Sequence, residues 1–198
     1  MTSPLIAARK VGILGGSFNP AHEGHLHISR VALARLDLDQ VWWMVSPQNP
    51  LKPVKGMGRL AERLAAARRL AADPRIRVTG IEETLGTRYT VDTLRALRVR
   101  FPRTRFVWIM GADNLIQIVR WKRWQSIFHI VPIAVFARPS YSLKALSDTA
   151  AQRFRHARLR QEQASVLVSQ RPPAWAFVNM PQNAASATRI RKSRGRRD

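Results

Sequence analysis

Short apolar runs alternate along the chain with longer stretches of mixed apolar and polar residues. The runs rich in β-branched and aromatic residues predict buried strands at 10–14, 40–46, 75–80, 105–111 and 130–137. The stretches between them have helical character and predict helices at 24–36, 57–72, 90–100 and 112–118, with another within 144–160. Helices that separate successive strands in this way are typical of βαβ units, so we expect a parallel sheet.

Length and composition favour one α/β domain. The chain has 198 residues, 45% of them hydrophobic, which is enough to bury a sizeable core. A cluster of Gly and Pro at 47–58 predicts a long loop after the second strand. Ligands of open parallel sheets bind at the carboxyl ends of the strands, near the point where the strand order reverses. We therefore expect the chemically active residues at 15–25, 46–55, 80–90, 110–124 and from 137 onward.

The charge of the chain is strongly unbalanced, since 34 Lys and Arg against 12 Asp and Glu give a net charge of +22. Such a field attracts polyanions, which include nucleic acids, acidic membrane surfaces and phosphorylated small molecules. Basic segments with interleaved aromatics, such as RWKRW at 120–124, keep a nucleic-acid-binding protein open as the non-enzyme alternative. If the protein is an enzyme, we expect it to bind nucleic acid only nonspecifically.

The sequence also bears on the compartment in which the protein works. The chain contains no cysteine, which excludes disulfides and thiolate metal sites and suits a reducing environment. Its first residues lack the basic and long apolar regions of a signal peptide. The longest unbroken apolar run, at 130–137, is far shorter than the roughly 20 residues that span a bilayer. We expect a cytoplasmic protein without a membrane partner.

The stretch GGSFNPAHEGH, at 15–25, lies where the first predicted strand passes into the first predicted helix. Gly15 and Gly16 allow a sharp turn and a close approach of the backbone to a ligand. His22 and His25 are spaced so that both lie on one face of a helix that begins near them. A helix N-terminus binds anions, and imidazole donors beside it suit phosphate oxygens. Two histidines alone are too few for a metal site, so we expect phosphate contacts and no resident metal ion.

This motif resembles the GGxFDPxHxGH signature of the nucleotidyltransferase superfamily with an HxGH motif. Further segments, in the same order along the chain, resemble those of bacterial nicotinate-nucleotide adenylyltransferases. They are the proline-rich loop at 47–52, RYTVDTL at 88–94, IMGAD at 109–113 with Trp121 downstream, FARP at 136–139 and SATRIR at 186–191. The resemblance implies a single nucleotidyltransferase domain over 1–191, with a Rossmann-like parallel sheet and helices on both faces. We expect 192–198 to form a disordered basic tail.

The resemblance implies a transfer of the adenylyl group of ATP to nicotinate mononucleotide, which gives deamido-NAD and pyrophosphate. The attacking phosphate is already anionic near neutral pH, so this chemistry needs no general base and no covalent intermediate. It needs two polyanions held in line and a site that stabilises negative charge on the transferred group. Mg²⁺ that arrives with ATP is expected to assist on the pyrophosphate side. ATP and nicotinate mononucleotide are then the expected partners, and the sequence indicates no oligomeric state.

The resemblance also assigns roles to individual residues. Catalytic roles fall to His22, His25 and Arg191. The ATP-binding set comprises Gly15, Gly16, Ser17, Phe18, His22, His25, Gly111, Asp113, Arg138, Ser186, Thr188 and Arg191. The set that binds nicotinate mononucleotide comprises Ser17, Lys52, Tyr89, Thr90 and Trp121, of which Trp121 would stack on the pyridine ring.

Alternatives to this assignment stay open at several positions. Asp113 could instead cap a helix N-terminus, and Trp121 could be a packing aromatic. Arg59 and Arg63 are interpreted as charges on the solvated face of a helix. The acceptor could instead be nicotinamide mononucleotide or another phosphate ester, because a sequence does not show which N–H donors face a carboxylate.

The chain departs from the family pattern at three points. Asn19 stands where the family has Asp, which removes a carboxylate near the phosphates and alters the expected metal dependence. Leu51 stands where the family often has His. Only seven residues follow Arg191, whereas family members commonly continue into a further helical segment.

Overall fold

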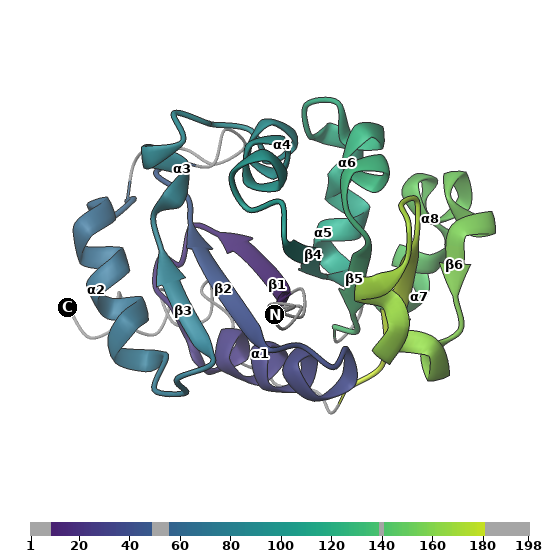
Figure 1. The fold of residues 1–198 in the computed structure, drawn as a ribbon, viewed down its shortest axis with the longest axis horizontal. Coiled ribbons are helices and arrows are strands. Elements are labelled where there is room, and N and C mark those ends of the chain that lie inside the picture. Colours follow the sequence, from purple (N-terminus) through teal and green to yellow (C-terminus); the bar gives the residue numbers. More distant parts are fainter. Residues whose placement is uncertain (1–8, 49–55, 139–140, 181–198) are drawn as a thin grey trace, which may run out of the picture.

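Seven parallel strands form one sheet in the computed structural model, which describes residues 9–48, 56–138 and 141–180 (Figure 1). Their order across the sheet is β3-β2-β1-β4-β5-β7-β6. The strands are β1 (Arg9–Gly16), β2 (Gln40–Val45), β3 (Ile76–Thr79), β4 (Thr104–Gly111), β5 (Ile133–Phe136), β6 (Arg158–Leu159) and β7 (Trp175–Val178). All the pairings between neighbouring strands are parallel, as the sequence pattern predicts.

Helices connect the strands and cover the sheet. The α-helices are α1 (Glu23–Arg35), α2 (Leu60–Leu70), α3 (Ile81–Thr84), α4 (Thr90–Arg100), α5 (Ala112–Gln117), α6 (Trp124–Ile130), α7 (Ser142–Ser147) and α8 (Thr149–Arg153). Short 3₁₀ helices are η1 (Ile118–Arg120), η2 (Arg155–Ala157) and η3 (Gln161–Ser169). None of the helices in the described part of the chain is long and apolar enough to cross a membrane.

The two faces of the sheet build two hydrophobic cores, because side chains alternate along each strand. On β4, Phe106, Trp108 and Met110 face a core shared with α4, α5 and α6, whereas Val107 and Ile109 face a core shared with α1. In Figure 1, α1 runs below the sheet, and α4 and α6 lie above it. Helices therefore cover both faces, as expected. Burial on both faces explains why the strands appear in the sequence as nearly continuous apolar runs.

The strand order reverses between β1 and β4. From β1 the chain moves to β2 and β3 on one side of the sheet, and it then returns to β4 on the other side. The register pairs Leu14 of β1 with Ile109 of β4, and Gly111 of β4 with Phe136 of β5. The carboxyl ends of β1, β4 and β5 therefore lie side by side, at the edge where a ligand is predicted to bind.

The structure corrects the prediction in the second half of the chain. The apolar run at 130–137 is predicted as one strand, but Ile130 ends α6 and β5 begins only at Ile133. Both elements are buried, so the apolar run does not show where one ends and the other begins. The helix expected within 144–160 consists of the two short helices α7 and α8. The prediction omits α3, α6, β6 and β7, which are too short to show a clear periodicity.

Candidate active site

The turn between β1 and α1 carries the first of the predicted site residues. Gly15 is required there because the Trp108 ring occupies the place that a Cβ would take. Phe18 has a φ of 46°, a left-handed conformation that is strained for a bulky residue. Its ring is 2% exposed and packs against Trp43 and His25, at centroid distances of 5.3 and 4.5 Å. The buried ring anchors the turn, so it is the backbone of Phe18 that remains a candidate for ATP binding.

Reciprocal hydrogen bonds fix His22 and His25 at the start of α1. His22 is the N-cap residue, and its Nδ1 accepts a hydrogen bond from the Gly24 N–H at 3.1 Å. The Nδ1 of His25 accepts one from the His22 N–H, also at 3.1 Å. A ring nitrogen that accepts carries no proton, so this pattern assigns the proton of each imidazole to Nε2. Two Nε2–H groups thus stand at the positive end of a 13-residue helix, on one face as predicted.

His22 is neutral at physiological pH. Its side chain is buried, and this burial, together with the positive charge of Arg138, lowers the pKa of the imidazole to about 4. A neutral His22 can donate a hydrogen bond from Nε2 but brings no charge of its own. Arg138 and the N-terminus of α1 therefore contribute to the positive potential at this point.

Asp113 and Arg138 form a second part of the site, beyond the carboxyl ends of β4 and β5. The Arg138 Nε lies 3.3 Å from the Asp113 Oδ1. Gly111 makes room for this ion pair, because a Cβ there would meet atoms of both side chains. The N-cap residue of α5 is Gly111, and no side chain caps that helix, so the interpretation of Asp113 as a cap is wrong. The charge of Arg138 lowers the pKa of His22, so the ion pair lies within electrostatic range of that imidazole.

Trp121, which is predicted to stack on the pyridine ring, is connected to the β1–α1 turn through Trp108. It follows η1, it is half-buried, and it meets Trp108 edge to face at a centroid distance of 6.3 Å. Trp108 in turn fills the space beside Gly15. Trp121 is therefore in part a packing residue, and it is joined to the β1–α1 turn through one other aromatic ring.

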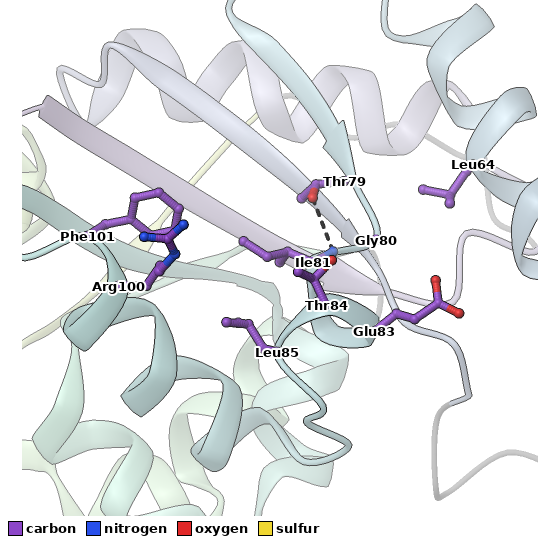
Figure 2. A pocket seen from close by; sticks show the side chains of 9 residues that line it. All are labelled: Leu64, Thr79, Gly80, Ile81, Glu83, Thr84, Leu85, Arg100 and Phe101. Carbon is purple, nitrogen blue, oxygen red and sulfur yellow. Dashed lines mark hydrogen bonds between the residues drawn. The ribbon is translucent and has the colours of Figure 1, made fainter.

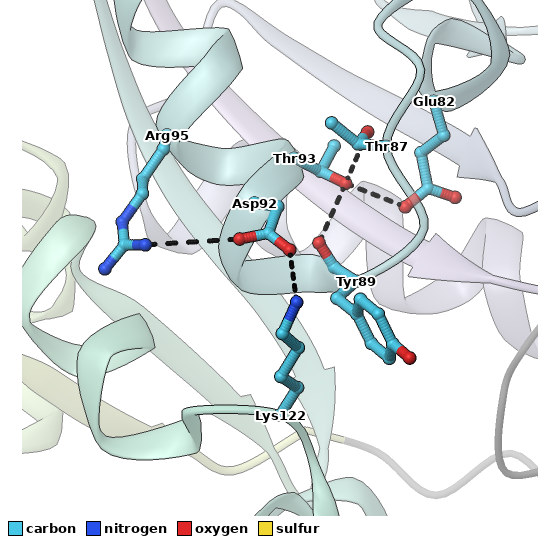
Figure 3. Close-up of polar contacts among 7 residues, drawn as sticks. All are labelled: Glu82, Thr87, Tyr89, Asp92, Thr93, Arg95 and Lys122. Atoms are coloured by element: carbon cyan, nitrogen blue, oxygen red, sulfur yellow. Dashed lines mark hydrogen bonds and ion pairs between the residues drawn. The ribbon is translucent and has the colours of Figure 1, made fainter.

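Lys122 joins the segment after η1 to the start of α4 (Figure 3). Its ammonium group lies 4.3 Å from the centroid of the Tyr89 ring and 3.1 Å from the Asp92 Oδ2. Tyr89 is the N-cap residue of α4, and Thr90 is the first residue of that helix. Arg95 approaches the other oxygen of Asp92, at 4.0 Å. These contacts place Tyr89 and the start of α4 close to Lys122, which follows Trp121 in the sequence.

A buried carboxyl group that the sequence analysis missed supports the start of α4 (Figure 3). Glu82 is 4% exposed, and the Thr93 Oγ1 lies 3.1 Å from its Oε1. The same hydroxyl lies 2.9 Å from the Thr87 Oγ1 and 3.1 Å from the Tyr89 carbonyl oxygen. Burial raises the pKa of Glu82, and hydrogen bonds with Ser46 and Thr93 oppose this shift. In the sequence, Glu82 stands beside a second Glu at a helix start and resembles an ordinary solvated acid.

Arg63 is not the solvated helix-face charge that the sequence suggests. Its side chain is 4% exposed and donates hydrogen bonds to four backbone carbonyl groups. Arg59 fits the interpretation, since it is exposed and pairs with Glu62 at 2.7 Å. The helical spacing of the two arginines does not distinguish them, because burial of Arg63 depends on segments distant in the sequence.

Asn19 bridges the β1–α1 turn to the residues before α2. Its Nδ2 donates a hydrogen bond to the Gly56 carbonyl oxygen at 2.8 Å, and its Oδ1 accepts one from the Gly58 N–H at 3.4 Å. An ionised Asp could accept from Gly58 but could not donate to Gly56. The amide therefore satisfies both neighbours, whereas the carboxylate of the family pattern would satisfy one.

The structure gathers most of the predicted site residues at one edge of the sheet. Those placed there are Gly15, Gly16, Ser17, Phe18, His22, His25, Tyr89, Thr90, Gly111, Asp113, Trp121 and Arg138. Lys52, Ser186, Thr188 and Arg191, together with Leu51 and the expected tail at 192–198, lie outside the described residues.

A separate hollow lies beside β3 (Figure 2). It has a volume of about 410 Å³, and Figure 2 shows Arg100 and Phe101, at the end of α4, across it from Leu64 of α2. Its remaining lining residues are Thr79, Gly80, Ile81, Glu83, Thr84 and Leu85. These residues and the predicted site residues do not overlap, so the hollow is not the predicted nucleotide site.

The fold and this site together define an α/β protein of the nucleotidyltransferase type. A family model described as cytidylyltransferase-like matches residues 13–193. A probable nicotinate-nucleotide adenylyltransferase from Parvibaculum lavamentivorans is 56% identical over 186 residues, which are 94% of this chain and 92% of that protein. A protein of the same name from Cereibacter sphaeroides (strain ATCC 17023) is 53% identical over 181 residues, which are 91% of this chain and 95% of that protein.

A solved structure, Plasmodium falciparum nicotinic acid mononucleotide adenylyltransferase complexed with NaAD, has the same fold. It matches with a TM-score of 0.70 at 15% identity, over 93% of this chain and 83% of that one. The chain belongs to the cytidylyltransferase-like family and, within it, to the nicotinate-nucleotide adenylyltransferases.

The lowered pKa of His22 makes folding stability depend on pH. In the unfolded chain the imidazole takes up a proton below about pH 6.5, whereas the folded protein resists protonation down to about pH 4. The stabilisation is therefore full above pH 6.5 and is lost as the pH falls toward 4. We expect His22→Asn, which keeps a capping side chain, to remove about 2 kcal/mol of the stability loss between pH 7 and pH 5.

Urea unfolding at both pH values measures this difference, with exposed His156→Asn as the matched control. Equal losses of stability in wild type and in His22→Asn would contradict a neutral, buried His22.

The bridge made by Asn19 predicts the effect of restoring the family's carboxylate. Asn19→Asp removes the donor to Gly56 and sets a carboxylate oxygen against that carbonyl group. We expect a loss of about 1 kcal/mol in the free energy of unfolding at pH 7. Exposed Asn179→Asp is the control and should change it by less than half as much. If Asn19→Asp were as stable as wild type or more stable in urea unfolding, the stabilising role of the hydrogen bonds from Asn19 to Gly56 and Gly58 would be contradicted.

Proposed function

We propose that the protein transfers the adenylyl group of ATP to nicotinate mononucleotide and so makes deamido-NAD and pyrophosphate, a step of NAD biosynthesis. The observation that carries the proposal is the pair of Nε2–H imidazoles at the start of α1, with the Arg138 guanidinium close to them. The relatives at 53–56% identity, which are named probable nicotinate-nucleotide adenylyltransferases, support this choice of acceptor.

The reaction requires stabilisation of charge and no nucleophilic side chain. A phosphate oxygen of nicotinate mononucleotide attacks the α-phosphorus of ATP and forms a new P–O bond. The bond from the α-phosphorus to the oxygen that bridges it to the β-phosphate breaks, and its electron pair leaves with pyrophosphate. Negative charge grows on the oxygens of the transferred group, where donors that are already oriented lower the barrier. We assign this role to His22 and His25, because backbone hydrogen bonds orient both rings before any substrate binds.

The remaining ATP contacts follow from the same arrangement. Arg138 supplies a positive charge for the triphosphate, and the Asp113 carboxylate can accept hydrogen bonds from ribose hydroxyl groups. Gly15 and Gly16 are proposed to let the backbone of the β1–α1 turn approach the phosphates, and the Phe18 N–H offers a backbone donor on that turn. Ser186, Thr188 and Arg191, which lie outside the described residues, are proposed to bind the β- and γ-phosphates, and Arg191 to act in catalysis.

The acceptor is proposed to bind between the turn and the start of α4. Trp121 would stack on the pyridine ring, with Tyr89 and Thr90 enclosing it and with Ser17 and Lys52 near its phosphate. Lys122 and Arg95 both pair with Asp92, so two cations share one carboxylate at the start of α4. The remaining positive charge favours a ring that bears a carboxylate over one that bears a carboxamide.

Mg²⁺ is proposed to enter the site as part of the Mg-ATP substrate. The described residues contain no group of three or more His, Asp or Glu side chains that could hold a metal ion. Triphosphate oxygens are hard ligands that Mg²⁺ prefers, so ATP itself can carry the ion. When bound in this way, the ion would offset the charge that develops on pyrophosphate.

Pyrophosphate release from Mg-ATP tests the function, with nicotinate mononucleotide, nicotinamide mononucleotide and phosphopantetheine supplied separately. We expect turnover with nicotinate mononucleotide to exceed that with either other acceptor at least tenfold. His25→Ala should lower kcat about 100-fold, because it removes a donor to the transferred group. Exposed His156→Ala should leave kcat unchanged. Faster turnover with another acceptor would reassign the substrate, and full activity of His25→Ala would remove the histidine from the mechanism.

A further inference from the structure

Arg63 is a buried cation whose hydrogen bonds go to backbone carbonyl groups. Its Nε donates to the Gly58 oxygen at 2.8 Å, and its Nη2 donates to the Pro47 oxygen at 2.8 Å. Its Nη1 lies 2.7 Å from both the Ser17 oxygen and the Ser46 oxygen. The guanidinium thus joins the approach to α2, five residues before it, to two segments that are distant in the sequence, namely the β1–α1 turn and the end of β2.

The hydrogen bond to Ser17 acts on the strained part of the turn. In a trans peptide the C=O and the N–H point in opposite directions. By drawing the Ser17 carbonyl toward itself, Arg63 directs the Phe18 N–H away from α2. Phe18, which supplies the N–H of this peptide group, has the left-handed φ of 46°, and its side chain is fixed because the ring is buried. The guanidinium and the ring together determine which way this backbone donor points.

The charge of Arg63 has no acidic counterpart in the described part of the chain, where no carboxylate forms an ion pair with it. Its neighbour Glu62 is exposed and pairs with Arg59 instead. A guanidinium stays protonated at any physiological pH, even where burial lowers its pKa as it does here. Carbonyl dipoles satisfy its hydrogen bonds but do not cancel its charge, so a positive potential remains next to the turn.

We propose that Arg63 is a positioning residue for adenylyl transfer. It fixes the orientation of the peptide group between Ser17 and Phe18 relative to the end of β2. It also places a fixed positive charge next to the β1–α1 turn, which is proposed to bind the triphosphate. This role rests on the proposed function. Lysine cannot reproduce it, because a single ammonium nitrogen cannot reach carbonyl groups that are arranged around a planar fork.

Arg63→Lys and Arg63→Gln test the proposal, with Arg68→Lys and Arg68→Gln as controls on an exposed position of the same helix. Each variant is assayed well below its own unfolding midpoint, so that the folded fraction is the same in all. We expect Arg63→Lys to lower kcat about 100-fold, as a displacement of the reacting groups by about 1 Å would do. The KM for nicotinate mononucleotide should change less than kcat, because Trp121, Tyr89 and Thr90, which are proposed to enclose the pyridine ring, lie on other elements and only Ser17 of the acceptor set is on the turn.

Two further measurements do not depend on turnover. The affinity for a non-hydrolysable ATP analogue should fall about tenfold in Arg63→Lys and further in Arg63→Gln, which also loses the charge. Hydrogen exchange followed by mass spectrometry should accelerate in peptides that cover 13–25 and stay unchanged in those that cover 90–100.

A folded Arg63→Lys that keeps kcat and analogue affinity within threefold of wild type would overturn the proposal. So would a loss of activity that tracks only the unfolded fraction, since that would make Arg63 a purely structural residue. If the wild type released no pyrophosphate with any acceptor, the proposed function would fail. Analogue affinity and exchange in 13–25 would then still decide whether Arg63 sets the turn for phosphate binding.

Discussion

Backbone N–H groups that donate to imidazole nitrogens are the constraint on which the site depends. The Gly24 N–H binds the Nδ1 of His22, and the His22 N–H binds the Nδ1 of His25. These bonds satisfy donors that any helix start leaves without partners. They also decide the tautomer of both rings, so the helix cannot begin properly without placing two protons on Nε2 atoms. Capping of α1 and preparation of a phosphate site are therefore the same structural event.

The rest of the structure holds this helix start in place. The Phe18 ring lies against Trp43 and His25, and the Ser29 hydroxyl joins the Trp43 indole to the His25 carbonyl oxygen at 2.7 Å on each side. Arg63 draws in the Ser17 carbonyl from the direction of α2. Each of these contacts comes from a different element, so the turn keeps its shape only when the whole first half of the sheet is folded.

Much of the fold and part of the site could be predicted from the sequence, because they depend on local patterns. Apolar runs identify strands that are buried on both faces, and the spacing of His22 and His25 already places them on one helical face. The burial of Arg63 and Glu82 could not be predicted, because it depends on carbonyl and hydroxyl groups that only the folded chain brings near. The hydrogen bonds of the Asn19 amide could not be predicted either, since its two partners, Gly56 and Gly58, lie 37 and 39 residues away in the sequence.

Nitrogen-15 NMR of the histidine side chains tests the central claim most directly, because Nδ1 and Nε2 give distinct shifts according to protonation. The chain has five histidines, and His22→Asn and His25→Ala would assign the two signals of interest. At pH 7 His22 should be neutral, both rings should have an unprotonated Nδ1 and a protonated Nε2, and binding of an ATP analogue should shift the Nε2 signals more than the Nδ1 signals. A proton on Nδ1 of either ring, or a His22 imidazolium at pH 7, would contradict the assignment of these groups as oriented, uncharged donors to phosphate.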